Sequence, residues 1–308
     1  MPAYLELHRS GELKNRAARA QAMLEDCQLC PHRCRANRIQ GKTGTCRTAA
    51  TAIVSSYGPH FGEEKPLVGA HGSGAIFLSY CNLRCVFCQN YTISQQGEGE
   101  PVDANEIAGM MLSLQKRGCH NINLVTPTHV VPQILSALVI AAESGLSIPL
   151  VYNCGGYESV ETLKLLDGVI DIYMPDMKYS DEPHARAFSG AKNYPDVNRK
   201  AVKEMHRQVG DLQIDGRGIA TRGLLVRHLV MPNNIAGTKG VVSFLAAEIS
   251  KETYLNVMDQ YRPAHRAHEI PRIARPLHRE EYLDAVKIAT EYGFERLDGL
   301  APGRLQSR

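Results

Sequence analysis

From about residue 75 onward, short apolar runs of strand length alternate with amphipathic segments of helical periodicity. The apolar runs are AIFLSY (75–80), NINLVTP (121–127), IPLVYN (148–153), VIDIYMP (169–175), GLLVRHLVMP (223–232) and TYLNVMDQY (253–261). A helical pattern after each run is typical of βαβ units, whose crossovers place the strands parallel. The runs are apolar nearly throughout, as expected for strands covered on both faces. The alternation therefore predicts an α/β fold built on a parallel sheet.

Six such units are fewer than the eight of a complete barrel, so we expect a partial (β/α)6 barrel or an open parallel sheet. We assign this fold to residues 66–308, which end in an amphipathic helix at 279–293. Residues 1–65 are expected to be an N-terminal cysteine-rich extension of helix and loop, with the helix at 11–27. Residues 260–279 are rich in Pro, His and Arg and predict a surface loop or a lid.

Charge and hydropathy narrow the range of partners and compartments. The formal net charge of +3 is too small to indicate nucleic-acid binding. No apolar run approaches the length of a membrane span, and the N-terminal segment has no apolar core of a signal peptide. We therefore expect a cytoplasmic protein that binds neither nucleic acid nor membranes. The nine cysteines are then expected to be reduced, so their clusters favour metal binding over disulfides.

Three cysteines, Cys81, Cys85 and Cys88, follow the first apolar run within eight positions. Sites in barrels and open α/β sheets form at the carboxyl ends of strands, so this loop is expected at the active rim. Thiolates are the usual ligands of iron–sulfur clusters, and three of them leave one iron of a four-iron cubane without a protein ligand. A small molecule could bind at that open iron. The alternatives are a structural zinc site completed by a distant ligand, or a chance cluster of cysteines.

The segment CNLRCVFC, with an aromatic residue before its last cysteine, resembles the signature of radical SAM enzymes. The resemblance implies a partial barrel of the radical SAM type and a 4Fe–4S cluster whose open iron binds S-adenosylmethionine. One electron then cleaves the sulfonium bond, and the resulting 5′-deoxyadenosyl radical abstracts hydrogen from a substrate.

Further segments resemble the PflX-type branch of the pyruvate formate-lyase activating enzyme-like proteins, over about residues 2–298. They include SYGPHFGEEKPLVG, VYNCGGYESVETL and DIYMPDMKYSD. This resemblance implies an oxidoreductase that activates a glycyl radical enzyme, with a flavodoxin or ferredoxin as electron donor. A small-molecule substrate is the alternative within the same chemistry. A metal-dependent scaffold protein with zinc in its cysteine groups is the alternative from a different class.

The same resemblance implies several cofactor contacts. Phe87 matches the aromatic residue that lies near the adenine. Thr126 and Thr128 stand where many radical SAM enzymes carry a Gly-Gly-Glu segment that meets the methionine amino group, and the segment here has no acidic side chain. Asn153 stands where an activase has an acidic residue, which leaves a bound alkali cation in doubt.

Two further contacts carry open alternatives. Lys178 in DMKY resembles a lysine that meets the cofactor carboxylate, although it could equally be a surface lysine paired with Asp176. His228 in VRHLVMP resembles a ribose-contacting histidine, although a histidine in an apolar strand is often a hydrogen-bonded core residue.

A second cysteine group precedes the regular pattern. Cys27, Cys30, Cys34 and Cys46 form a four-thiol set, with glycines before the last cysteine that suit a turn. Such a set suits structural zinc or a closed iron–sulfur cluster, and unmetallated thiols are the third alternative. His32 could substitute for one of the cysteines.

Overall fold

The computed structural model describes residues 1–298. Its centre is a sheet whose strand order is β10-β9-β8-β6-β5-β4-β2-β1-β3, with β7 paired to β8. Six neighbouring strands are mutually parallel. They are β2 (Ser73–Leu78), β4 (Ile122–Val125), β5 (Leu150–Cys154), β6 (Ile172–Pro175), β8 (Ala220–Leu229) and β9 (Tyr254–Met258). Within the described residues the order does not return from β10 to β3, so the sheet is an open partial barrel and the predicted α/β fold is confirmed.

Four strands were not anticipated from the sequence. They are the antiparallel β1 (Ala52–His60), β3 (Glu100–Val102) and β7 (Gln213–Ile214), and the short β10 (Leu297–Asp298), which is parallel to β9. β1 pairs with β2 along its length and carries β3 on its other side. Its sequence contains a glycine and a proline, and it has exposed positions, so it lacks the continuous apolar character of the parallel strands.

Helices connect the parallel strands as predicted. They are α4 (Ala104–Lys116), α5 (Val131–Glu143), α6 (Val160–Leu165), α7 (Glu182–Ser189), α8 (Tyr194–Val209), α9 (Thr238–Glu248) and α10 (Arg279–Glu291). The expected N-cap of α4 is present: the Asp103 side chain accepts the backbone N–H of Glu106, and the Glu106 side chain accepts the backbone N–H of Asp103. This reciprocal pair satisfies two donors at the helix N-terminus.

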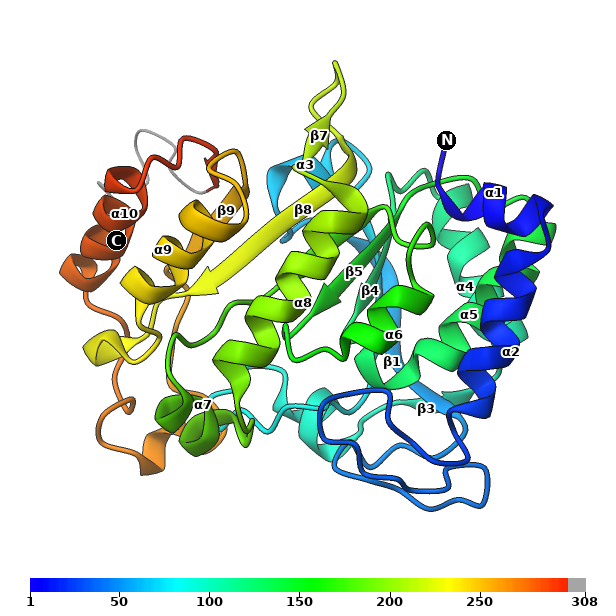
Figure 1. Ribbon diagram of the computed structural model, residues 1–308, viewed down its shortest axis with the longest axis horizontal. Coiled ribbons are helices and arrows are strands. Elements are labelled where there is room, and N and C mark those ends of the chain that lie inside the picture. The colour runs from blue at the N-terminus through cyan, green and yellow to red at the C-terminus, as the bar shows by residue number, and fades with distance from the viewer. Residues whose placement is uncertain (299–308) are drawn as a thin grey trace.

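The N-terminal segment begins with α1 (Tyr4–Arg9) and α2 (Glu12–Ala22), which lie alongside α5 at one end of the molecule (Figure 1). The remaining helical elements are short: α3 (Lys65–Val68), the π-helical turn η1 (Thr92–Gln96) and the 3₁₀ turns η2 (Thr128–Val130), η3 (Pro232–Asn234) and η4 (Ala267–Glu269).

The division at residue 65 stays a prediction, and its second range extends beyond the described residues. β1 and both N-terminal helices pack on the sheet and its helices. No helix within residues 1–298 combines the length and apolar character needed to cross a membrane.

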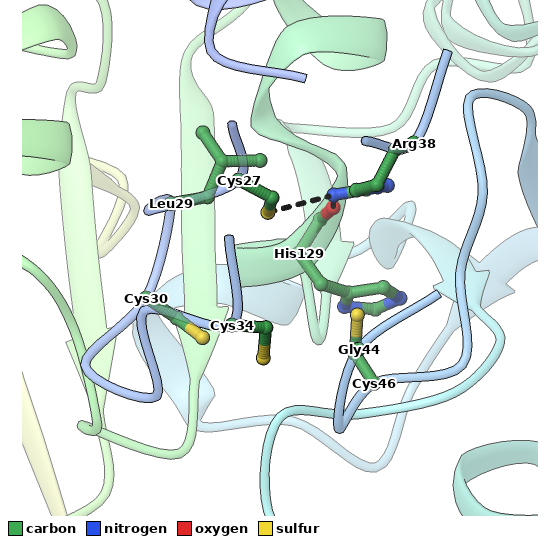
Figure 2. Close-up of a pocket in the computed structure, with 8 residues that line it drawn as sticks. All are labelled: Cys27, Leu29, Cys30, Cys34, Arg38, Gly44, Cys46 and His129. Carbon is green, nitrogen blue, oxygen red and sulfur yellow. Dashed lines mark hydrogen bonds between the residues drawn. The ribbon is translucent and has the colours of Figure 1, made fainter. Parts of the chain in front are cut away.

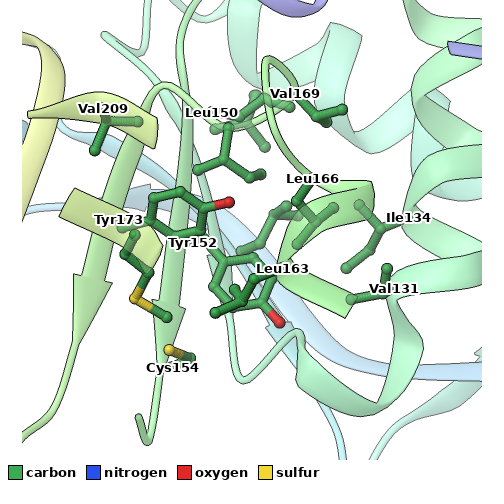
Figure 3. Close-up of a cluster of buried hydrophobic side chains, with 14 of the residues drawn as sticks. Val131, Ile134, Leu150, Tyr152, Cys154, Leu163, Leu166, Val169, Tyr173 and Val209 are labelled. Carbon is green, nitrogen blue, oxygen red and sulfur yellow. The ribbon is translucent and has the colours of Figure 1, made fainter. Parts of the chain in front are cut away.

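The hydrophobic core lies between the sheet and its helices, and Figure 3 shows the part where α5, β5 and α6 meet. Leu163 is fully buried here. The rings of Tyr152 and Tyr173 meet edge to face at 5.7 Å. Their hydroxyls donate to Glu158 (3.0 Å) and Gln208 (2.7 Å), so neither polar end is left unpaired in the core.

Candidate active site

Cys81, Cys85 and Cys88 lie on the three-cysteine loop (residues 79–91), which leaves the carboxyl end of β2 as predicted. The Cys85 sulfur is 3.0 Å from the hydroxyl of Ser189, and the Cys88 sulfur is 3.1 Å from that of Ser94. Hydroxyls can donate to thiolate sulfur, so both contacts suit a charged or metal-bound form.

Backbone hydrogen bonds hold the shape of this loop. The Arg84 N–H donates to the Ser189 carbonyl (2.9 Å), and the Val86 N–H donates to the Phe188 carbonyl (2.8 Å), so the loop is fastened to the end of α7. Tyr80 has a positive φ of 66° just before the first cysteine. Such a conformation is unusual for a bulky residue and is characteristic of functional turns.

The protonation of these thiols depends on what binds them. Burial raises the pKa of Cys81 well above its usual range and raises that of Cys85 to about 11, although Lys178 opposes both shifts. Without a bound metal the two groups are therefore neutral thiols at pH 7. A metal centre that binds thiolates would replace the protons, so metal binding is linked to proton release.

The donor set fits a cluster of several irons. Within residues 1–298, no three His, Cys, Asp or Glu side chains are gathered as ligands of a single metal ion. A cubane does not require such convergence, because each thiolate binds its own iron. Three thiols on one loop at the sheet edge therefore fit a 4Fe–4S cluster with one iron open, and they do not form the compact shell of a structural zinc site.

A buried charge network lies beside this loop. Asp176, at the end of β6, accepts from Lys178 Nζ (2.5 Å) and from Arg227 Nε (2.9 Å). The three side chains are 12%, 15% and 18% exposed, respectively. Arg227 also donates to the Asn153 side-chain oxygen (2.7 Å), which links the ends of three parallel strands.

Burial raises the pKa of Asp176, but the cations of Arg227 and Lys178 outweigh it and hold the carboxyl ionised. Burial likewise lowers the pKa of Lys178, yet Asp176 and then Cys85 reverse this, so the amine stays protonated. Lys178 is therefore paired with Asp176, as one alternative stated, but it is buried beside the cysteines and not on the surface.

Arg227 was not singled out from the sequence. The available signal was an arginine within an otherwise apolar strand, because a buried guanidinium needs an acidic partner. Here it has Asp176, with Glu63 at 3.9 Å as a second carboxylate. The Asn153 oxygen is occupied by Arg227 and so already has a cationic partner.

Thr126 and Thr128, in the segment after β4, have different partners. Thr126 has a positive φ of 64°, and its N–H donates to the Asn153 carbonyl (2.9 Å). The Thr128 hydroxyl is fully buried and donates to Glu158 (2.8 Å). The segment itself has no acidic residue, but Glu158 from the loop after β5 supplies a carboxylate to it. The sequence could not reveal this contact, because the two residues lie on different βα loops.

Two of the expected cofactor contacts have partners within the protein. His228 is fully buried; its Nδ1 bonds the Met177 carbonyl (2.7 Å) and its Nε2 bonds the Thr238 hydroxyl (3.0 Å). His228 therefore has the geometry of a hydrogen-bonded core residue, which was one of the two alternatives. A ribose contact would require His228 to break one of these two bonds. The ring of Phe87 packs against that of Tyr261, with centroids 5.9 Å apart.

The predicted surface loop at 260–279 packs against the three-cysteine loop. The Arg266 N–H donates to the Val86 carbonyl (2.8 Å), and the rings of His265 and Tyr91 stack at 5.0 Å. This loop therefore forms one wall of the region that holds the three cysteines.

The second cysteine group gathers around a cavity. Cys27, Cys30, Cys34 and Cys46 line it together with Leu29, Arg38, Gly44 and His129 (Figure 2). His32 does not line this cavity: its Nε2 bonds the Asn82 carbonyl (2.7 Å) next to Cys81.

Sequence relationships agree with this geometry. Residues 75–216 match the family model of the radical SAM superfamily. The chain is 32% identical over 286 residues to the uncharacterized protein MJ0674 of Methanocaldococcus jannaschii, covering 90% of this chain and 78% of that one. The protein belongs to the radical SAM superfamily. Membership implies a 4Fe–4S cluster and S-adenosylmethionine as cofactors.

A second protein of the same organism, the uncharacterized MJ0808, is 24% identical to this radical SAM protein over 296 residues, 87% of this chain and 82% of its own. Among solved structures, Streptococcus suis SuiB bound to the precursor peptide SuiA has a TM-score of 0.49 and 16% identity. The match covers 69% of this chain and 44% of SuiB. HydG, a maturase of the FeFe-hydrogenase, has a TM-score of 0.47 and 16% identity, with 69% and 48% covered. This radical SAM protein thus spans less than half of either chain, and its place in the PflX-type branch stays a prediction.

Proposed function

We propose that this protein reductively cleaves S-adenosylmethionine and uses the resulting radical to abstract hydrogen from a substrate. One observation carries the proposal: three thiols on one loop lie at the carboxyl end of the first parallel strand, beside a buried Asp176–Lys178–Arg227 network. When bound, the cluster and S-adenosylmethionine supply the electron transfer and the 5′-deoxyadenosyl radical. The protein supplies the ligands, the charge and the exclusion of water.

Cys81, Cys85 and Cys88 would hold the cluster. Lys178 is placed to attract the carboxylate of S-adenosylmethionine. Its Nζ makes one hydrogen bond within the described residues, to Asp176, so two of its three donors are left for a ligand. Electrostatic coupling between Lys178 and both Cys81 and Cys85 supports its nearness to the cluster position.

The network keeps this cation in position. Asp176 forms ion pairs with both Lys178 and Arg227. Arg227 holds the Asp176 carboxylate in place, and this carboxylate in turn positions Lys178. A cation that is already oriented loses less freedom when it binds an anion. The backbone of Thr126 and the carboxylate of Glu158, through Thr128, are candidates for the amino end of the cofactor.

The substrate and reductant are proposed from the family resemblance. We favour a glycyl residue of a partner enzyme as the hydrogen donor, with a small molecule as the alternative, and a flavodoxin or ferredoxin as the electron source. Phe87, on the three-cysteine loop, and the loop at 260–279, which packs against it, would border the cofactor.

The test is anaerobic reconstitution with iron and sulfide, followed by S-adenosylmethionine and a chemical reductant, with 5′-deoxyadenosine as the product measured. We expect a brown protein that forms 5′-deoxyadenosine, and a Cys85→Ala variant that does not. Cys119→Ala is the matched control, because Cys119 is a buried thiol outside both cysteine groups. A colourless zinc protein, or an active Cys85→Ala variant, would contradict the proposal and favour a scaffold role.

A further inference from the structure

The cavity lined by the second cysteine group has the features of a binding site for a metal centre. Cys27, Cys30 and Cys46 are at most 8% exposed, and Cys34 lies at the outer edge. Figure 2 shows the four sulfur atoms around a common space.

The backbone around the cavity is shaped to bring these thiols together. Arg33, Arg35 and Arg47 all have positive φ values, between 43° and 56°, and each follows a cysteine by one to three positions. Non-glycine residues in this conformation cost free energy and persist where a ligand or the surrounding fold requires them. The Thr45 N–H donates to the Cys34 sulfur at 3.4 Å.

Gly44 permits the closest approach in this loop. A Cβ at this position would lie 2.5 Å from the Cys34 sulfur, which is closer than real contacts allow. The glycine therefore lets the loop segment that carries Cys46 pass directly against Cys34.

His129, on the wall of this cavity, gives independent support for a bound metal centre. His129 is 1% exposed, and its Nδ1 has no hydrogen-bond partner among the described residues. Its Nε2 bonds the Ser79 carbonyl at 2.8 Å and therefore carries the ring proton, so Nδ1 presents a lone pair. A buried nitrogen lone pair that meets no donor can coordinate a metal ion, and His129 lines the cavity.

Arg38 adds a buried positive charge to the same wall. It is 1% exposed, and it donates to the carbonyls of His129 (2.7 Å) and Ala49 (2.8 Å) and lies 3.9 Å from the Cys27 sulfur. A fixed cation offsets part of the negative charge that four thiolates bring to a metal centre.

The four thiols line the cavity without converging on the position of a single metal ion. Tetrahedral zinc with Zn–S bonds of about 2.3 Å would hold its four sulfurs about 3.8 Å apart. In the described part of the chain, neither cysteine group converges as the ligands of a single ion. The three-cysteine loop shares this property, and membership of the superfamily implies a cluster there.

We propose that the cavity binds a second iron–sulfur cluster through the thiolates of Cys27, Cys30, Cys34 and Cys46, with His129 lying against it. The site is packed directly on the three-cysteine loop. His129 bonds Ser79, the Arg84 guanidinium donates to the Thr45 carbonyl (2.5 Å), and His32, two residues after Cys30, bonds Asn82. The two metal centres are thus joined by short hydrogen-bonded connections.

The decisive sample is a Cys81/Cys85/Cys88→Ala variant, reconstituted anaerobically and analysed for iron, acid-labile sulfide and zinc. We expect about four irons and four sulfides per chain and the electron paramagnetic resonance signal of a reduced cluster. Adding Cys30→Ser and Cys46→Ser should remove both, whereas adding Cys119→Ala should remove neither. Circular dichroism checks that each variant is folded.

Stoichiometric zinc without iron would overturn the cluster, and a folded variant without metal would overturn the site. The unsubstituted protein gives a second readout if the triple variant does not fold: about eight irons per chain support two clusters, and about four irons that persist after Cys30→Ser and Cys46→Ser contradict the proposal. None of these measurements depends on cleavage of S-adenosylmethionine.

His129 is tested separately in the triple-alanine background. We expect His129→Ala to keep the iron content but to shift the g-values of the reduced cluster, because the group that faces the metal centre has changed. An unchanged spectrum would remove His129 from the site.

Discussion

Replacing Lys178 tests whether the buried charge network serves the cofactor. Lys178 Nζ is 2.5 Å from Asp176, and its side chain is 15% exposed. A charge-assisted hydrogen bond contributes about 1.5–3 kcal/mol, which corresponds to roughly ten- to hundred-fold in affinity. We expect Lys178→Ala to raise the dissociation constant for S-adenosylmethionine by that factor while the iron content and visible spectrum stay unchanged.

The same substitution also affects the free energy of unfolding. Removing one partner of a buried ion pair costs about 3–5 kcal/mol when the other charge is left uncompensated. Asp176 keeps Arg227 as a partner, so the loss should lie below that range.

The affinity is measured by calorimetric titration of the reconstituted, anaerobic protein. Lys203→Ala is the matched control, because Lys203 pairs with Glu248 on the surface with half of each side chain exposed. Exposed pairs contribute roughly 0–1 kcal/mol, so neither affinity nor stability should change much. If Lys178→Ala bound S-adenosylmethionine as tightly as the parent, Lys178 would be a structural residue only and the comparison with activases would lose its support at this position.

Three further predictions concern the second cysteine group, a buried carboxyl and the core. Gly44→Ala should reduce the iron bound at the second site, because its Cβ would clash with the Cys34 sulfur, whereas Gly216→Ala, which meets open space, should not; equal iron in both would refute the close-approach argument. Burial raises the pKa of Glu158 from 4.5 to about 7. Between pH 4.5 and 7 the folded state therefore binds more protons than the unfolded state. The free energy of unfolding should fall by about 3 kcal/mol as the pH rises through this range. Glu158→Gln should remove this part of the pH dependence in urea unfolding at pH 5–8, and parallel pH profiles would contradict it. Leu163→Ala should lower the free energy of unfolding by about 2–5 kcal/mol in the same assay, because the side chain is fully buried. A loss below about 1 kcal/mol would show instead that the surrounding core relaxes into the space left by the leucine.

The parallel strands and their helices were predictable because their signal is local. Continuous apolar runs identify strands covered on both faces, and helical periodicity identifies the segments between them. β1 was missed because its pattern is irregular, and its place depends on pairing with β2. A strand with such an irregular pattern is specified by its neighbours in the sheet more than by its own composition.

The candidate site divides in the same way. Spacing alone singled out Cys81, Cys85 and Cys88 as candidate ligands, since a motif on one short loop needs no tertiary information. Arg227 and Glu158 were missed because their partners lie on other βα loops.

By itself, the amino-acid sequence determined the fold class, the position of the three-cysteine loop after the first parallel strand and the existence of a second thiol group. Each of these depends on residue types at short spacing along the chain. The tertiary structure decided what each polar group contacts: it paired Lys178 with Asp176 in a buried network, enclosed His228 in the core and turned His129 toward the second cysteine group. Those contacts join residues on separate elements, and whether a polar side chain binds a ligand or a neighbouring residue is decided by burial and by the partners that packing brings within reach.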